Sequence, residues 1–121
     1  MSETPDVITT PVDGVWLVRV GGEFDLDSTG GLAEALDPAP HHAARGVVLD
    51  LSLVDFADST FLHVLLEARK RFAAAALPFV LVRPHRHVRR LLDLTDTARA
   101  FTVAGDVPAA IALVHARSGG R

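Results

Sequence analysis

The sequence contains no cysteine and no tyrosine, has a single tryptophan and a single methionine, and carries no excess of positive charge. The lack of cysteine excludes disulfide bridges and thiolate metal sites, and it is compatible with a reducing compartment. A net charge of -3 provides no overall attraction to nucleic acid or to an anionic membrane surface. These absences favour a protein or a neutral ligand as partner, and we expect no nucleic acid binding and no membrane insertion.

A long apolar run is also missing. The longest apolar window, FAAAALPFVLV at residues 72–82, has about half the length of a bilayer-spanning helix and is interrupted by Pro78. The N-terminal stretch MSETPDVITT is polar and acidic, without the apolar segment of a signal peptide. We therefore expect a cytoplasmic protein.

The composition that remains is that of a folded domain. The chain has 121 residues, of which 49% are apolar and 22% charged, which suits one domain with its own hydrophobic core. We expect that core to cover about residues 7–116 of a single domain spanning 1–121, with 117–121 as a flexible tail.

Hydrophobic periodicity predicts alternating strands and helices along the chain. Strand patterns cover residues 7–10, 15–20, 46–54, 78–82 and 100–103, and helix patterns cover a short stretch before Pro38 and residues 61–76, 85–96 and 107–116. Asp27 or Ser28 could cap the first helix, and Asp106 the last.

The connections between these elements predict the fold class. The Asp13-Gly14 pair between the first two strands is typical of an antiparallel hairpin. The continuous apolar run at 46–54 predicts a central strand covered on both faces, and the helices between later strands require parallel crossovers. We therefore predict an α/β domain with a mixed, mainly parallel sheet of about five strands packed with about four α-helices.

Two hydroxyl residues, Ser59 and Thr60, stand where the best strand pattern meets the best helix pattern. Loops that leave the carboxyl ends of parallel strands often carry binding sites, and a helix N-terminus favours an anion. Asp55 and Asp58 oppose an added phosphate by like charge, so phosphorylation would sharpen a negative patch. The alternative is that Ser59, Thr60 or Asp58 is only the N-cap of the helix, and the pattern by itself does not decide between them.

A family resemblance bears on this junction. The segment VVLDLSLVDFADST, followed by an amphipathic helix, the PFVLV strand and VRRLLDLT, resembles the STAS domain family, the anti-sigma factor antagonists. The segment GGEFD at residues 21–25 is similar to the Gly-Glu-Leu-Asp segment of that family. The resemblance extends from about Val15 to Phe101 and implies a single STAS-like domain of a bacterial type that is not an enzyme and needs no cofactor.

The resemblance also implies roles for particular residues. Ser59 matches the serine that is phosphorylated by an anti-sigma factor that is also a serine kinase. The dephosphorylated form would bind this anti-sigma factor and release its sigma factor for transcription, and a serine phosphatase would reset the switch. Asp25, Asp58, Ser59, Thr60 and Phe61 would form the partner-binding edge.

Two positions depart from the family pattern. Phe61 stands where the family has glycine, and Thr95-Asp96 stands where the family often has Leu-Thr-Gly. A large ring at Phe61 could hinder a kinase, or could serve as an apolar anchor for a different partner. This departure motivates an alternative, a permanent STAS subunit of a larger assembly such as a stressosome-like or lipid-transport ABC complex. A third class is a small-molecule or nucleotide-binding module, but the chain has no glycine-rich phosphate loop.

The histidines do not predict a metal site. His41 and His42, and likewise His85 and His87, have no carboxylate or cysteine at ligand spacing. His63 lies one helical turn after Ser59, but the flanking glycines of a hydrolase nucleophile elbow are missing. We therefore expect neither a bound metal nor hydrolase activity.

Arginines are concentrated just before and within the third helix pattern, residues 85–96. They are Arg83, Arg86, Arg89 and Arg90. Without interleaved aromatic residues they favour a solvated helix face over a nucleic acid site, and docking of an acidic partner stays open.

Overall fold

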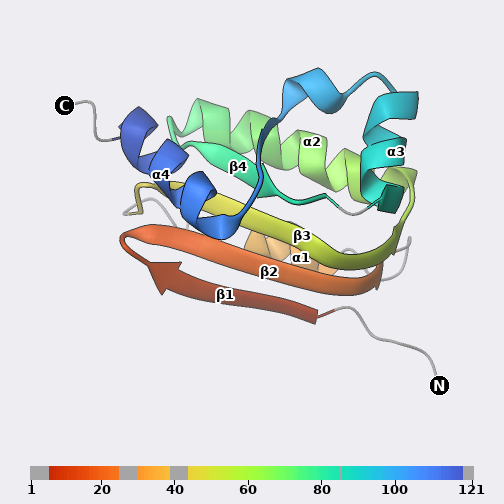
Figure 1. Ribbon diagram of the computed structural model, residues 1–121, viewed down its shortest axis with the longest axis horizontal. Coiled ribbons are helices and arrows are strands. Elements are labelled where there is room, and N and C mark those ends of the chain that lie inside the picture. Colours follow the sequence, from red (N-terminus) through yellow and green to blue (C-terminus); the bar gives the residue numbers. More distant parts are fainter. Residues whose placement is uncertain (1–5, 25–29, 39–43, 85, 119–121) are drawn as a thin grey trace.

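The computed structural model describes residues 6–24, 30–38, 44–84 and 86–118, which form five strands and four α-helices in alternation (Figure 1). The elements are β1 (Asp6–Val12), β2 (Val15–Phe24), α1 (Gly30–Ala35), β3 (Gly46–Ala57), α2 (Ser59–Ala74), β4 (Phe79–Val82), α3 (Arg86–Leu94), the 3-10 turn η2 (Ala98–Ala100), β5 (Thr102–Ala104) and α4 (Val107–Ser118). The predicted order of strands and helices is confirmed.

The strands form one sheet in the order β1-β2-β3-β4-β5, with β1 antiparallel to β2 and all other neighbours parallel. The predicted mixed sheet and the central place of β3 are confirmed. Asp13 and Gly14 connect β1 to β2 with positive φ angles of 52° and 79°. Two residues in the left-handed region make the tight turn whose twist suits an antiparallel hairpin.

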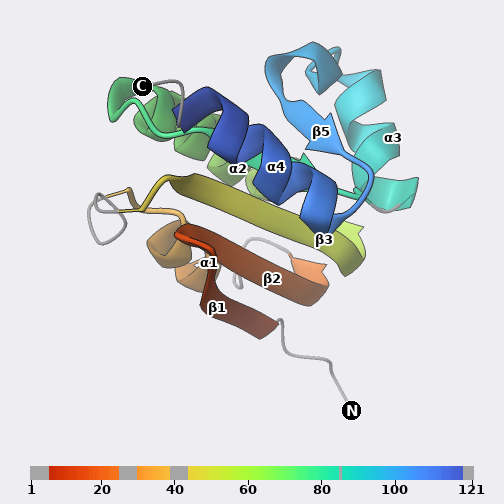
Figure 2. The ribbon, with the colours of Figure 1, turned by 60° about the vertical axis from the view of Figure 1, so that its left-hand side comes forward.

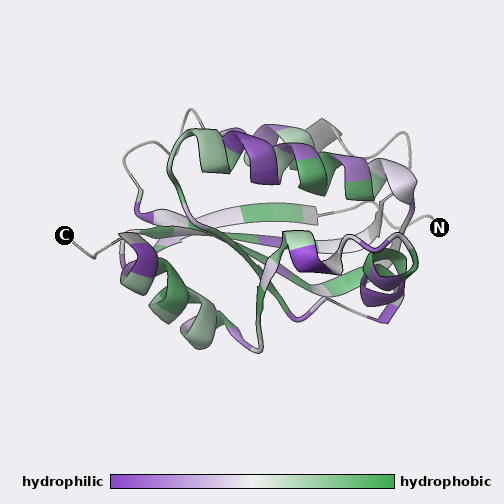
Figure 3. Ribbon diagram, turned by 90° about the horizontal axis from the view of Figure 1, so that it is seen from above, coloured by the Kyte–Doolittle hydropathy of each residue, from purple (hydrophilic) through white to green (hydrophobic). Residues whose placement is uncertain are grey.

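Helices cover both faces of this sheet. Val47, Leu49 and Leu51 point from β3 into a core shared with α1, α2 and α3. Val48, between them, joins a second core under α4, because successive side chains of a strand point to opposite faces. Figure 2 shows α4 crossing the sheet on its own side. In Figure 3, α2 carries both hydrophilic (purple) and hydrophobic (green) residues, whereas most of α4 is hydrophobic.

The end of α2 is anchored on the beginning of β4 by two stacked aromatic rings. The centroids of Phe72 and Phe79 lie 5.2 Å apart, with an angle of 6° between the ring planes. Both side chains are buried, so this contact fixes the direction in which α2 returns to the sheet.

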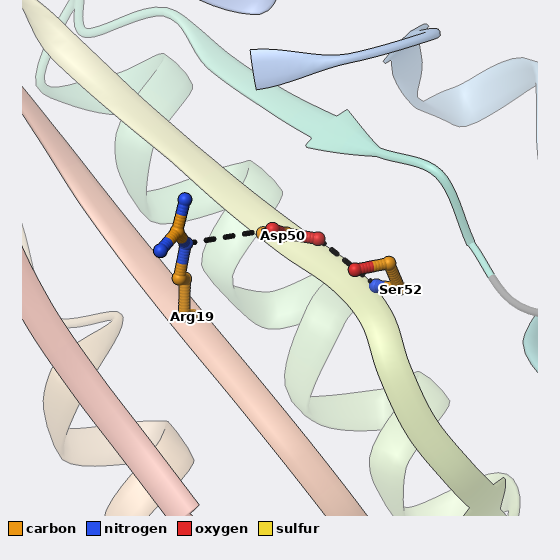
Figure 4. Close-up of polar contacts among 3 residues, drawn as sticks. All are labelled: Arg19, Asp50 and Ser52. Carbon is orange, nitrogen blue, oxygen red and sulfur yellow. Dashed lines mark hydrogen bonds and ion pairs between the residues drawn. The ribbon is translucent and has the colours of Figure 1, made fainter.

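The face of the sheet that carries α4 also has polar and exposed residues. Nε of Arg19 lies 3.6 Å from Oδ2 of Asp50, and Oδ1 of Asp50 accepts the backbone N–H of Ser52 at 3.0 Å (Figure 4). Ile8, which is opposite Arg19 in the β1–β2 register, is 60% exposed. An apolar side chain and an ion pair therefore lie side by side on this face.

β2 and β3 are longer than the sequence predicts. Their parallel pairing continues through two register shifts and ends with Phe24 opposite Ala57. Gly21 permits this pairing because a Cβ there would lie 3.2 Å from Cβ of Leu53, and Gly22 adopts a positive φ of 92°. The two glycines of the GGEFD segment therefore continue the strand pair to the edge of the sheet.

The helix ends also differ from the prediction. α2 begins at Ser59, not at Phe61, and α4 continues through Ser118, so residues 117 and 118 belong to a helix and not to a flexible tail. Asp106 accepts the backbone N–H of Ala109 at 2.8 Å, which confirms its predicted capping role. The proposed caps Asp27 and Ser28 lie outside the described residues.

In the described part of the chain, no helix combines the length and the apolar character that crossing a membrane would require.

Candidate functional site at the start of α2

The N-cap of α2 is Asp58. Its backbone is extended, with φ -113° and ψ -169°, and its Oδ1 atom accepts the N–H groups of Thr60 at 2.9 Å and of Phe61 at 3.3 Å. A carboxylate in this position satisfies two of the free N–H groups of the first turn and interacts favourably with the helix dipole. Of the three capping residues that the sequence left open, the structure selects the aspartate.

Ser59 is the first residue of the helix, and its side chain is exposed. Within the described residues its hydroxyl makes no hydrogen bond. Thr60 is half-buried, and neither hydroxyl caps the helix. The serine is thus accessible, and the local fold does not depend on its hydroxyl.

Phe61 points the other way, into the core between the sheet and its helices. Its side chain has 0% exposure and is among the largest fully buried side chains of the described protein. The ring therefore does not lie over Ser59, and a role as an exposed anchor does not fit this position. Phe61 fills core volume at the position where the family resemblance predicts glycine.

The neighbouring strand end brings a second part of the predicted site to the same edge. β2 ends at Phe24, which pairs with Ala57, the last residue of β3. Asp25 follows Phe24 directly, but it lies outside the described residues, as the side chain of Asp55 does, so their geometry stays a prediction. Figure 1 shows the beginnings of α2 and α3 at this same end of the sheet.

A shallow groove of about 300 Å³ runs along α2 beside α1 and begins one turn after the serine. His63, Glu67 and Arg71 border it at helical spacing, and Leu36 and Val64 supply apolar surface. Sequence reasoning tested His63 only as a catalytic base and missed this surface, which the i, i+4, i+8 spacing of the three polar residues could have indicated.

The second family departure has a simple backbone explanation. Asp96 follows α3 with a positive φ of 57°, the conformation that favours glycine. The N–H of Thr97 donates to the carbonyl of Leu92 at 2.9 Å, and the N–H of Asp96 donates to that of Asp93 at 3.2 Å. Aspartate tolerates the left-handed region better than most residues, so α3 can end in this conformation without glycine.

Within the described residues, the other candidates do not gather into a site. The four arginines of the α3 region are exposed, as expected for a solvated face. Among the described residues, no group of three histidine or acidic side chains could hold a metal ion. His41, His42 and His85 lie outside those residues.

The strand order, the two helical layers and an exposed serine after an aspartate cap define a small α/β domain whose candidate site is a strand-to-helix junction. Comparison with known proteins assigns the family. Residues 12–105 match the family model described as Mlab, STAS domain. The chain therefore belongs to the STAS domain family, as the sequence pattern predicts.

Three relatives illustrate the similarity. The anti-sigma-F factor antagonist RsfB of Mycobacterium tuberculosis (strain CDC 1551 / Oshkosh) is 31% identical over 107 residues, covering 84% of this chain and 88% of the relative. The crystal structure of an anti-sigma factor antagonist from Mycobacterium paratuberculosis is 25% identical, with a TM-score of 0.83 over 95% of this chain and 99% of that one. The anti-sigma factor antagonist SpoIIAA in its unphosphorylated form has a TM-score of 0.75 at 17% identity, covering 92% and 97%, and shows the fold alone.

Proposed function

We propose that this protein is an anti-sigma factor antagonist that works as a phosphorylation switch, with Ser59 as the phosphoacceptor. The observation that carries the proposal is the separation of two roles at the start of α2: Asp58 caps the helix, and the neighbouring serine is exposed and makes no hydrogen bond within the described residues. A serine that does not cap its helix can be modified without removing a structural contact.

The electrostatics of the junction suit such a switch. A phosphoserine adds about 1.5 to 2 negative charges near neutral pH. The carboxylate of Asp58 already accepts the N–H groups of Thr60 and Phe61, so a phosphate on Ser59 must either displace it or lie beside it as a second anion. In both cases the modification changes the charge and the hydrogen bonds of the surface that a partner would meet.

The partner would be an anti-sigma factor with serine kinase activity. It would bind the dephosphorylated form at the edge formed by Asp25, Asp58, Ser59 and Thr60, and a serine phosphatase would restore that form. The names of the mycobacterial relatives support this role, because both are antagonists of anti-sigma factors. The protein would then act in the cytoplasm, on sigma-factor-dependent transcription, and would be a substrate of the kinase and not an enzyme.

Phosphorylation of the purified chain by its cognate kinase tests the proposal. Intact-mass analysis after incubation with ATP should show the addition of one phosphate, which Ser59→Ala abolishes and Thr60→Ala retains. Ser59→Asp should weaken binding to the dephospho-specific partner by about tenfold or more, because it adds a second negative charge beside Asp58 to the surface that the partner recognises. Phosphate addition that persists in Ser59→Ala would overturn the assignment.

The alternative function is that of a permanent subunit of a larger assembly, which was suggested because a ring at Phe61 could hinder a kinase. The Phe61 ring is buried and Ser59 is exposed, so the ring gives no reason to prefer this alternative. Purification from the source organism separates the two functions. A stable stoichiometric complex without any phosphorylated form would support the subunit, whereas association that depends on the phosphorylation state of Ser59 supports the switch.

A further inference from the structure

β1 forms one edge of the sheet. Within the described residues only β2 pairs with it, and Figure 1 and Figure 2 show it at the outer margin of the sheet. It spans seven residues, Asp6–Val12, whereas β5 at the opposite edge has three, Thr102–Ala104. A short strand is one way in which proteins protect an edge from further pairing, so β1 is the less protected of the two edges.

The register of the β1–β2 hairpin shows which backbone groups of β1 point outward. Val12 and Val15 flank the two-residue turn, so they form a hydrogen-bonded pair, and such pairs recur at every second residue along the strands. Val7, Thr9 and Pro11 lie between these pairs, and their backbone groups face away from β2. Pro11 has no N–H to donate, which suits this outward position. Val7 and Thr9 thus each present an N–H and a C=O at the open edge.

One face of β1 is also uncovered. Val7 packs against the core shared with α1, α2 and α3, but Ile8 points to the other face and is 60% exposed. α4 reaches this face near the hairpin turn, where Nε2 of His115 lies 2.9 Å from the carbonyl oxygen of Asp13 and Val12 packs against the core under α4. Ile8 lies four residues before Val12. An exposed apolar side chain therefore lies on an open strand edge, a combination that favours pairing with another strand.

Charge does not protect this edge. Exposed edge strands often carry lysine or another charged residue, but the segment VITTPV, residues 7–12, has none. Arg19, which is opposite Ile8 on β2, lies 3.6 Å from Asp50, so its charge is partly compensated within the same copy. A strand can therefore approach this segment without meeting an unpaired charge on β2 beside Ile8.

We propose that β1 pairs with β1 of a second copy of this chain, antiparallel and about a two-fold axis at Ile8, so that the two sheets become continuous. In this register Val7 of each copy is opposite Thr9 of the other, and their outward N–H and C=O groups form about four hydrogen bonds. The two exposed Ile8 side chains meet in a non-hydrogen-bonded pair, with Cα atoms about 4.5 Å apart. A register centred on Thr9 would instead place Val7 opposite Pro11, which has no N–H to give.

A second copy is the occupant that this edge fits because the segment is complementary to itself. Pairing about a two-fold axis brings the same surface of both copies together. Each copy then supplies the donors, the acceptors and the apolar side chain that the other lacks. The inference goes beyond the proposed switch and does not depend on it, since no residue at the start of α2 takes part.

The mass of the full chain in solution tests the pairing. Sedimentation equilibrium should show a mass that rises with concentration from 12.9 kDa towards twice that value. Ile8→Lys should raise the dissociation constant about tenfold or more, because an apolar contact is lost and two ammonium groups face each other at the axis. A parent protein that stays monomeric at its highest soluble concentration would leave the edge to a strand of another protein and overturns the proposal.

Leu53→Lys is the matched control for the substitution at Ile8. Leu53 is 69% exposed, but it belongs to β3, two strands from the edge, so the dissociation constant should not change. Ser59→Ala should also dimerise like the parent. An equal loss of affinity in Ile8→Lys and Leu53→Lys overturns the pairing at β1.

The absence of cysteine from the chain permits a direct test of the register. Ile8→Cys brings one thiol of each copy to a Cα separation that suits a disulfide, so mild oxidation should link the two copies. The thiols of Thr10→Cys would lie about 13 Å apart along the strands, so they should link at least about tenfold more slowly. Equal rates of linking in the two variants overturn the pairing about Ile8.

Discussion

Oδ1 of Asp58 accepts the backbone N–H of Thr60 at 2.9 Å, and this bond assigns the cap of α2 to the residue before the exposed serine. Asp58 therefore stabilises the helix, while the neighbouring Ser59 is the proposed site of phosphorylation. Asp58 satisfies the first turn, whereas Ser59 presents its hydroxyl to solvent. Substitutions at the two positions should therefore have different effects.

Asp58→Ala should lower the free energy of unfolding by about 1 kcal/mol, because the N–H groups of Thr60 and Phe61 lose their acceptor. Asp58→Asn should retain most of the stability, since asparagine is an equally good cap. Ser59→Ala should stay within about 0.5 kcal/mol of the parent. Urea unfolding measures all three, and a larger loss in Ser59→Ala than in Asp58→Ala would contradict the assignment of the cap.

Phe61→Ala should destabilise the protein by about 3–5 kcal/mol, because a wholly buried ring is replaced by a cavity. Phe61→Gly, which restores the family residue, should be worse by about 1 kcal/mol more, since glycine also disfavours the helix. Phe61→Leu should cost less than Phe61→Ala, because leucine fills more of the space that the ring occupies. Chemical denaturation checks the order, and a neutral Phe61→Gly would show that the ring does not support the core.

Most of the fold could be predicted from the sequence because its signals are local. The Asp13-Gly14 turn, the apolar run of β3 and the capping Asp106 each depend on a few neighbouring residues, and all are found in the structure. The extension of β2 to Phe24 was missed, because it depends on the close approach of Gly21 to a residue of another strand. Long-range register of this kind has no local sequence signal.

At the candidate site, too, some features follow from the local sequence and others depend on contacts between distant parts of the chain. The sequence placed Ser59 at a strand-to-helix junction, but three residues could have capped the helix, and only the direction of the Asp58 side chain decides between them. The burial of Phe61 was also beyond local reasoning, because it depends on the volume that the sheet and the helices leave to fill.

Ala76 follows the C-cap of α2, Ala75, and adopts the left-handed region with a φ of 60°. Its N–H donates to the carbonyl of Ala73 at 3.0 Å. An alanine pays a steric cost in this conformation that glycine avoids. Ala76→Gly should therefore raise the free energy of unfolding by about 0.5–1 kcal/mol. Thermal and urea unfolding measure the change.

The matched control for this substitution is Ala74→Gly, two residues earlier in the last turn of the helix. There the same chemical change should lower stability by about 0.5–1 kcal/mol, because glycine is a poorer helix former than alanine. Opposite signs for the two variants are expected. An equal decrease in the free energy of unfolding of both variants would show that the positive φ at Ala76 does not destabilise the parent protein.

Gly46 lies at the beginning of β3, where α4 and the loop before β4 approach the strand. A Cβ at this position would lie 2.7 Å from Cγ1 of Val114 and 2.9 Å from the carbonyl oxygen of Pro78. That oxygen also accepts the N–H of Val47 at 2.9 Å, so it cannot move away without loss of the bond. Gly46→Ala should therefore destabilise the protein by about 1–3 kcal/mol.

Gly105→Ala is the control, because a Cβ at this position would meet no atom within 4 Å. The free energy of unfolding of this variant should stay within about 0.5 kcal/mol of the parent. Equal stability of the two variants in urea unfolding would contradict the close packing of α4 against the beginning of β3.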